Sequence, residues 1–237
     1  SELNLDGNNL SEETLDLSAY SGLGYLMLNS NKFTQFDASK LPNLFNLGLN
    51  NNLLTSITLD NPDIWSLALS TNALTEIDHS GVPALYQIAL EHNQLSELNI
   101  DGLSHLDILF IDYNRFRFST LPLGTNLSLY TYANQAALPV ELVEGKIDLS
   151  SEANIDGTAT VYRWFVNAPF VDNEGALTGE ELYVDDEYSV EGGVTSFHSM
   201  INNVVGALTN DKFPKLILLT EPVDITSTTG VETTMLN

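Results

Sequence analysis

The sequence predicts a mainly β chain in which a solenoid of stacked short strands is followed by a β-sandwich domain. Two observations lead to this prediction. Leucine and asparagine recur in one frame every 20 to 23 residues through the first 137 residues of the 237-residue chain, a period typical of solenoids. After residue 137 this frame stops, and short alternating runs separated by turn clusters replace it, as in β-sandwiches.

The repeat contains an eleven-residue pattern, LxxLxLxxN followed by x and Leu or Phe. Near-complete copies begin at Leu23, Leu44, Ile64, Leu85 and Leu106. A weaker copy begins at Leu127, where Gln135 replaces the asparagine, and a partial copy that contains Asn8 precedes the first full one. Because side chains alternate along a strand, the two leucines of each LxL point inward and their neighbours point outward. Stacked copies therefore bury a continuous ladder of leucines.

The asparagine of each copy falls where the chain turns off the strand. Asparagine tolerates turn geometry, and its amide can bond backbone groups of neighbouring coils. We therefore expect a structural ladder formed by Asn8, Asn31, Asn52, Asn72, Asn93 and Asn114. A unit of this length has no room for a full helix on its outer side, so we expect turns, short strands or 3₁₀ pieces there.

The consensus LxxLxLxxNxLTxIDxSGxPx resembles the leucine-rich repeat, in particular the internalin-like short repeats of bacterial cell-surface proteins. The resemblance covers residues 1–137, about seven repeats of 20–23 residues. It implies a right-handed solenoid with a parallel sheet on the concave face and turns or 3₁₀ pieces on the convex face. It also implies a secreted or cell-surface bacterial protein whose signal peptide has been removed. The absence of cysteine excludes the disulfide-capped repeats of animal receptors.

We predict that the second half, residues 138–226, forms an immunoglobulin-like (Ig-like) β-sandwich and that residues 227–237 form a flexible tail. Trp164 lies on the strongest predicted strand and resembles the core tryptophan of an Ig-like domain, although the usual cysteine pair is absent. The segment also resembles the small sandwich that follows the repeats in bacterial leucine-rich surface proteins. The candidate strands are 146–150, 158–166, 181–184, 188–191, 194–201, 216–220 and 223–226.

Composition and motifs exclude several function classes. The chain has 8 basic and 32 acidic residues, a formal net charge of −24, which repels nucleic acid and anionic lipid. No apolar run approaches the roughly 18 residues of a membrane span. The sequence contains no cysteine and no HExxH, GxSxG, P-loop or GxGxxG motif. We therefore predict a non-enzymatic chain with no catalytic residue, metal site, cofactor, nucleic-acid partner or membrane span.

The outward strand positions vary between repeats while the inward ones do not, which indicates a binding surface. The middle repeats carry the small residues Gly48, Ala68 and Ala89, and the last repeats carry aromatic residues beside acidic ones. Exposed aromatics with polar neighbours are the usual mark of a recognition patch. The candidate ligand-binding residues are Tyr25, Met27, Asn46, Gln87, Glu91, His92, Ile108, Phe110, Asp112 and Tyr113.

Some of these residues have a second interpretation. Ile108 and Phe110 lie near the end of the repeats and could instead pack against the second domain. His92 beside Glu91 is either a weak metal or acid–base partner or a plain surface histidine. The acidic turns at 172–174 and 185–187 lack the ligand spacing of a calcium site, so we interpret them as solvated turns.

Together these features favour an extracellular binding or adhesion module that recognises a protein on the concave face of the solenoid. A glycan is the less favoured ligand. The alternative is a structural spacer or stalk within a larger surface protein.

Overall fold

A computed structural model describes residues 1–172, 176–198, 201–218 and 223–225, and the chain forms two compact units. The first unit comprises Ser1–Phe116 and Thr120–Gln135, and the second comprises Arg117–Ser119 and the described residues from Ala136 onward. The predicted tail, 227–237, and parts of three predicted strands (199–200, 219–220 and 226) lie outside the described residues.

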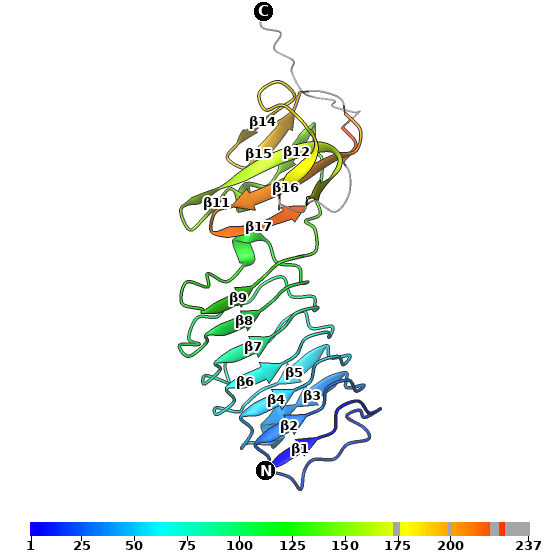
Figure 1. Cartoon of the computed structure of the whole chain (residues 1–237), viewed down its shortest axis with the longest axis vertical. Helices are drawn as coiled ribbons and strands as arrows, with labels where there is room; N and C mark the ends of the chain where they lie inside the picture. Colours follow the sequence, from blue (N-terminus) through cyan, green and yellow to red (C-terminus); the bar gives the residue numbers. More distant parts are fainter. Residues whose placement is uncertain (173–175, 199–200, 219–222, 226–237) are drawn as a thin grey trace, which may run out of the picture. The chain divides into compact units, whose positions relative to one another are not determined.

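The first unit is a solenoid built on a seven-stranded parallel sheet, with the strands in chain order across the sheet (Figure 1). Each strand pairs in register with the next copy of the repeat; Leu26, for example, pairs with Leu47. The prediction of a mainly β solenoid of stacked coils is therefore confirmed. The strands are β1 (Glu2–Asn4), β2 (Tyr25–Met27), β4 (Asn46–Gly48), β6 (Ser66–Ala68), β7 (Gln87–Ala89), β8 (Ile108–Phe110) and β9 (Leu129–Thr131).

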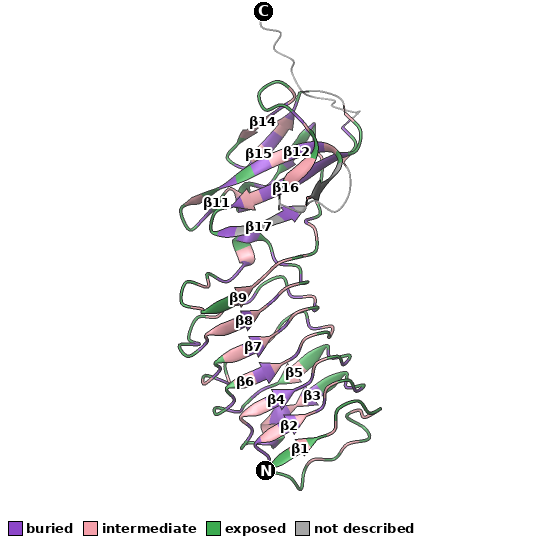
Figure 2. Ribbon diagram, viewed as in Figure 1, coloured by how far each residue is buried: buried purple, intermediate pink, exposed green. Residues whose placement is uncertain are grey.

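The two inward apolar residues of each LxL lie in the core of the solenoid. Leu26 and Leu28 are fully buried, and the equivalent pairs of the next four coils are at most 2% exposed. Each such side chain contributes about 1.5–3 kcal/mol of hydrophobic stabilisation. Figure 2 shows buried and half-buried residues along the middle strands of the sheet, and exposed residues on the connecting segments and in β1, β5 and β9.

The return segments of the coils carry only short elements. β3 (Gln35–Asp37) and β5 (Ser56–Thr58) form a separate two-stranded parallel sheet. A 3₁₀ turn, η1 (Ala38–Lys40), follows β3 and is capped by the Asp37 carboxylate, which accepts the Ser39 N–H at 3.2 Å. A second 3₁₀ turn, η2, spans Phe118–Thr120. None of the helices among the described residues is long and apolar enough to cross a membrane.

The asparagine side chains tie each coil to the coil before it. The Asn93 amide donates to the carbonyls of Leu69 in the preceding coil and Leu90 in its own coil, both at 3.0 Å. Its oxygen accepts the Leu74 N–H of the preceding coil, also at 3.0 Å. One side chain thus gives hydrogen-bond partners to three backbone groups of a buried turn. These groups therefore avoid the free-energy penalty of a buried polar group without a partner. The same three contacts are made by Asn31, Asn52, Asn72 and Asn114.

The two ends of this ladder differ from its middle. Gln135 occupies the last position and reproduces the pattern, donating to Ile111 O and Tyr132 O and accepting from Phe116 N at 2.8–3.0 Å. Asn8, in the first coil, is exposed and donates only to carbonyls of its own coil, Leu5 O among them.

The second unit contains a three-stranded and a five-stranded sheet, with antiparallel pairing in both. The three-stranded sheet has the order β10 (Lys146–Asp148), β15 (Val194–Phe197), β14 (Tyr188–Glu191). The five-stranded sheet consists of β11 (Asn154–Ile155), β12 (Thr158–Val171), β16 (Val204–Asn210) and β17 (Phe213–Leu218), with β13 (Leu177–Glu181) also paired to β12. A short 3₁₀ turn, η3 (Ser150–Glu152), follows β10.

The core of the second unit brings residues of both sheets together. Trp164 of β12 is fully buried and meets Phe197 of β15 edge to face, with ring centroids 4.9 Å apart. Its indole N–H donates to Thr195 Oγ1 at 3.2 Å, so the polar atom of this large side chain is satisfied. Elsewhere in the unit the buried Glu152 carboxylate accepts the N–H and hydroxyl of Ser119 at 2.9 and 2.6 Å.

Several details of the strand prediction for this unit are wrong: β11 was not predicted, the described part of 223–226 holds only an isolated bridge, and two further differences concern partners of β12. β16 was not predicted, although it pairs with β12 over seven residues. The strand predicted at 181–184 instead ends at Glu181 as β13. In both places glycine and charged or amide residues weaken the strand signal, while tertiary pairing with β12 sets the strand.

We predict that Asn93→Ala lowers the free energy of unfolding by about 3 kcal/mol, because three backbone groups lose their partner. Asn8→Ala is the matched control and should cost less than about 1 kcal/mol, since Asn8 is exposed and makes no contact with another coil. Urea unfolding followed by circular dichroism measures both. Equal losses in the two variants would contradict a stabilising role for contacts between coils.

Candidate functional site

The candidate surface is the outward face of the seven-stranded sheet, here called the strand face. It is formed by the first and third residue of each strand, which flank a buried central residue in β2, β6, β7 and β8. Because successive strand residues point to opposite sides, these two positions per coil are free of the core. The strand face is therefore a regular array whose side chains can change without disturbing the leucine ladder.

The middle of the strand face is covered by small side chains. Gly48, Ala68 and Ala89 stand at the third position of β4, β6 and β7, and they pair in register. A Cβ added to Gly48 would lie 2.7 Å from Met27 Sδ, so the Met27 side chain lies directly over this glycine. Met27 thus covers one end of the small-residue floor and leaves the rest of it open to a partner's approach.

One border of the strand face is an aromatic row that the sequence analysis missed. The residue that precedes each strand forms what we call the leading row, and in three consecutive coils it is Phe45, Trp65 and Tyr86. Trp65 and Tyr86 are 40% and 41% exposed, with ring centroids 6.4 Å apart. Phe45 meets Tyr25 of β2 edge to face at 4.4 Å. The signal was present as LFN, IWS and LYQ, an aromatic residue after the first apolar position of three copies.

An acidic group continues the leading row. The Asp107 carboxylate accepts the Tyr86 hydroxyl at 2.8 Å and the Ser128 hydroxyl at 2.5 Å. These hydrogen bonds, that of Ser128 first, lower the pKa of Asp107, and the bond to Asp107 raises the pKa of Tyr86. Tyr86 is thereby oriented along the row as a neutral phenol.

The opposite border, here called the trailing row, has a backbone constraint. Its seven members all have φ between 54° and 69°, the left-handed region. Glycine or asparagine adopts this conformation most readily, whereas a β-branched residue such as Thr71 is strained there. In this row the rings of His92 and Tyr113 stack with centroids 4.1 Å apart and planes 9° apart, and Tyr113 is 48% exposed. The members are Gly7, Ser30, Asn51, Thr71, His92, Tyr113 and Asn134.

Between the strand face and the trailing row lies a second polar ladder. Asp112 Oδ1 accepts the Ala133 N–H of the next coil at 2.7 Å, and the Thr131 hydroxyl also donates to this carboxylate. Glu91 accepts the Ser70 hydroxyl at 2.5 Å. The two acidic candidates for ligand binding are thus engaged by neighbouring coils. Side chains of Asp6, Asn29 and Asn50 accept N–H groups of the next coil in the same way.

The structure places the remaining candidates at different points of the same face. Asn46 and Gln87 are the first residues of β4 and β7, and both are half-buried. Ile108 and Phe110, the outer residues of β8, are half-buried as well. His92 lies in the trailing row next to Tyr113, not in a cluster of metal-ligating side chains. In the described ranges no three His, Asp or Glu side chains gather in a way that could hold a metal ion.

Comparisons with known proteins give structural neighbours at low identity. The functional domain of InlJ from Listeria monocytogenes matches 93% of this chain and 57% of its own, with 19% identity and a TM-score of 0.44. InlP from Listeria monocytogenes matches 92% and 64%, with 18% identity and a TM-score of 0.45. An internalin, InlF, from the same species matches 64% and 50%, with 20% identity and a TM-score of 0.41. The chain thus spans less than two thirds of these structures. No protein-family model and no curated protein matches the sequence.

We predict that Thr71→Asn raises the free energy of unfolding by about 0.5–1 kcal/mol, because asparagine tolerates the left-handed conformation better than threonine. Thr75→Asn is the control, since Thr75 is also exposed and is not among the residues with positive φ. Urea unfolding of the two variants beside the parent chain measures the difference. A gain of the same size at both positions would show that backbone strain at Thr71 is not the cause.

Proposed function

We propose that this chain is a non-enzymatic leucine-rich repeat module that binds a protein ligand on the strand face. The observation that carries the proposal is the set of exposed aromatic side chains on the two borders of that face. Trp65 and Tyr86 lie in the leading row and Tyr113 lies in the trailing row. Tryptophan and tyrosine are the residues most enriched among those that dominate binding energy.

The rigidity of the support favours recognition without rearrangement. The aromatic side chains stand on strands joined by register pairing and by side-chain amides that bridge the coils. Binding then costs little ordering of the surface, which leaves more of the contact energy as affinity. Between the borders, the small residues Ala68 and Ala89 let a partner's side chains approach the sheet closely.

The size of the face favours a protein over a glycan. Seven strands at roughly 4.8 Å each give a surface about 30 Å wide. A standard protein interface, to which one partner contributes roughly 800 Å², is about as wide as this. The acidic groups near the borders are held by neighbouring coils, so affinity on this proposal comes mainly from the aromatic side chains.

The repeat resemblance extends the proposal to location and domain organisation. We assign the chain to the secreted or cell-surface proteins of a bacterium, with repeats over residues 1–137 and an Ig-like β-sandwich over 138–226. Support for the sandwich comes from Trp164, which packs on Phe197 of the other sheet. The lack of cysteine fits repeats that need no disulfide caps.

A photo-crosslinking amino acid at Tyr86 or Tyr113 tests the binding face directly. The matched control carries the same amino acid at Tyr183, a tyrosine of the second unit that is 72% exposed and lies outside the strands. After incubation with solubilised extracellular proteins, we expect one protein adduct at positions 86 and 113 and none at position 183. Mass spectrometry of the adduct then identifies the partner.

With that partner in hand, Trp65→Ala should weaken binding at least tenfold, about 1.4 kcal/mol, while Tyr183→Ala leaves the Kd unchanged. Biolayer interferometry measures both. Adducts that form equally at all three positions would contradict the assignment of the face. Failure to capture any protein at positions 86 and 113, together with no signal on a glycan array, would favour the spacer or stalk role instead.

A further inference from the structure

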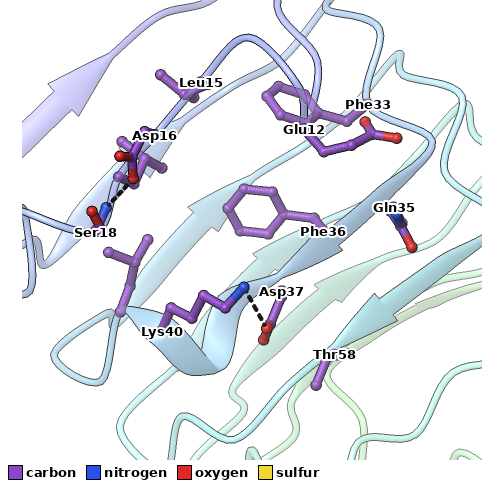
Figure 3. Close-up of a pocket in the computed structure, with 12 residues that line it drawn as sticks. Glu12, Leu15, Asp16, Ser18, Phe33, Gln35, Phe36, Asp37, Lys40 and Thr58 are labelled. Atoms are coloured by element: carbon purple, nitrogen blue, oxygen red, sulfur yellow. Dashed lines mark hydrogen bonds and ion pairs between the residues drawn. The ribbon is translucent and has the colours of Figure 1, made fainter.

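A pocket of about 720 Å³ lies outside the strand face, between the first coil and strand β3 (Figure 3). The first coil is longer than the others, with 23 residues from Asn8 to Asn31 against 20 or 21 in the following coils. Its main chain still pairs with the second coil where Lys32 N donates to Leu10 O at 2.8 Å. At Thr34, however, the Glu12 side chain accepts the N–H in place of a backbone carbonyl. The two coils separate from this point, and the pocket opens between them.

The separation leaves one edge of β3 facing the pocket. In the part of the chain that the structure describes, β3 pairs with β5 alone, and the two form a two-stranded sheet. An edge strand presents unpaired N–H and C=O groups to any extended chain that lies beside it. Strand addition of this kind is a recurring mode of peptide recognition, in which the backbone supplies affinity and alternate side chains supply specificity.

The pocket has an apolar floor. Phe36 of β3 lies at its centre in Figure 3 and meets the buried Phe33 edge to face, with ring centroids 5.7 Å apart. Leu15 and Leu17 of the first coil line the opposite wall and remain half-buried. Covering the two leucines with a partner's apolar side chain would gain about 25 cal/mol for each Å² removed from water.

Carboxylates surround this floor. Glu12, Asp16 and Asp37 line the pocket, and Lys40 is the one cation among the lining residues, paired to Asp37 at 3.3 Å. Hydrogen bonds lower the pKa of each carboxyl: to the Thr34 side chain for Glu12, to Ser18 for Asp16, and to the Ser39 side chain for Asp37. The carboxylates are therefore ionised at neutral pH, and the pocket is anionic.

We propose that this pocket binds an extended basic segment of a partner polypeptide, which adds to the open edge of β3. Because side chains alternate along a strand, such a segment places apolar side chains on Phe36 and Leu15 and basic ones beside Asp16 and Glu12. The open edge selects an extended backbone, and the carboxylates select Lys or Arg over acidic residues. This site shares no residue with the strand face, so its failure or success leaves the proposed function unaffected.

The test uses the fluorescein-labelled peptide acetyl-Lys-Val-Arg-Val-Lys-amide and fluorescence anisotropy with the whole chain. Asp16→Lys should weaken binding at least tenfold. Glu13→Lys is the matched control, since it makes the same charge change at the exposed neighbouring acid that does not line the pocket, and it should change the Kd less than twofold. Circular dichroism checks that both variants remain folded.

Two further probes distinguish backbone pairing with the edge of β3 from binding by charge alone. A version of the peptide with all five residues N-methylated loses its residue N–H donors toward β3 and should bind at least tenfold more weakly, and the Glu-Val-Glu-Val-Glu analogue should not bind. Amide shifts of Phe36 and Asp37 in NMR spectra should move on addition of the basic peptide. The proposal is overturned if Asp16→Lys and Glu13→Lys weaken binding equally, if methylation has no effect, or if spermine competes as well as the unlabelled peptide.

Discussion

The solenoid depends on one interaction, the side-chain amide that satisfies backbone groups of two adjacent coils at once. A turn buried between stacked coils exposes no backbone to water, so each of its N–H and C=O groups needs a partner within the stack. The Asn93 side chain supplies three such partners, and the equivalent residues repeat this from coil to coil. Hydrophobic burial holds the leucines together, but it is nondirectional. The amide contacts fix the position of each coil relative to the previous one, and they bring the strands into register.

Because register is fixed from inside, the outer surface is free to carry other chemistry. The leading row and the trailing row each take one residue per coil, the strand face takes two, and none of them contributes to the leucine ladder. This freedom has a limit in the trailing row, where the backbone is left-handed at every member. Aromatic side chains at His92 and Tyr113 are held there at the expense of backbone strain. A recognition residue placed in this row therefore costs stability, whereas one in the leading row does not.

Much of the fold follows from the repeat, while parts of the candidate site do not. The inward leucines were predictable because their spacing is strict and burial is their sole requirement. Trp65 and Tyr86 were missed because their position precedes the strand and lacks a consensus residue, although aromatics recur there. Asp112 was predicted as a ligand-binding residue, but its bond to the next coil was not predictable, because that bond depends on stacking geometry. Gln135 makes the same contacts as the asparagines although its side chain is longer. The repeat pattern requires asparagine at this position, so it does not predict these contacts. The pocket beside β3 arises from two extra residues in the first coil, and the repeat pattern does not predict the conformation of such an insertion.

Because the amide contacts join only adjacent coils, the number of coils in such a chain can change during evolution. Every bond of Asn93 ends in its own coil or in the one before it. A gene segment that encodes one whole coil can therefore be duplicated or deleted in frame, and the new junction repeats the contacts of the old one. The 20-residue spacing between Asn52 and Asn72, against 21 in the coils that follow, shows that the return segment absorbs single-residue changes. Length is thus the property of this architecture that recombination can alter most readily, with the breakpoints confined to whole repeats.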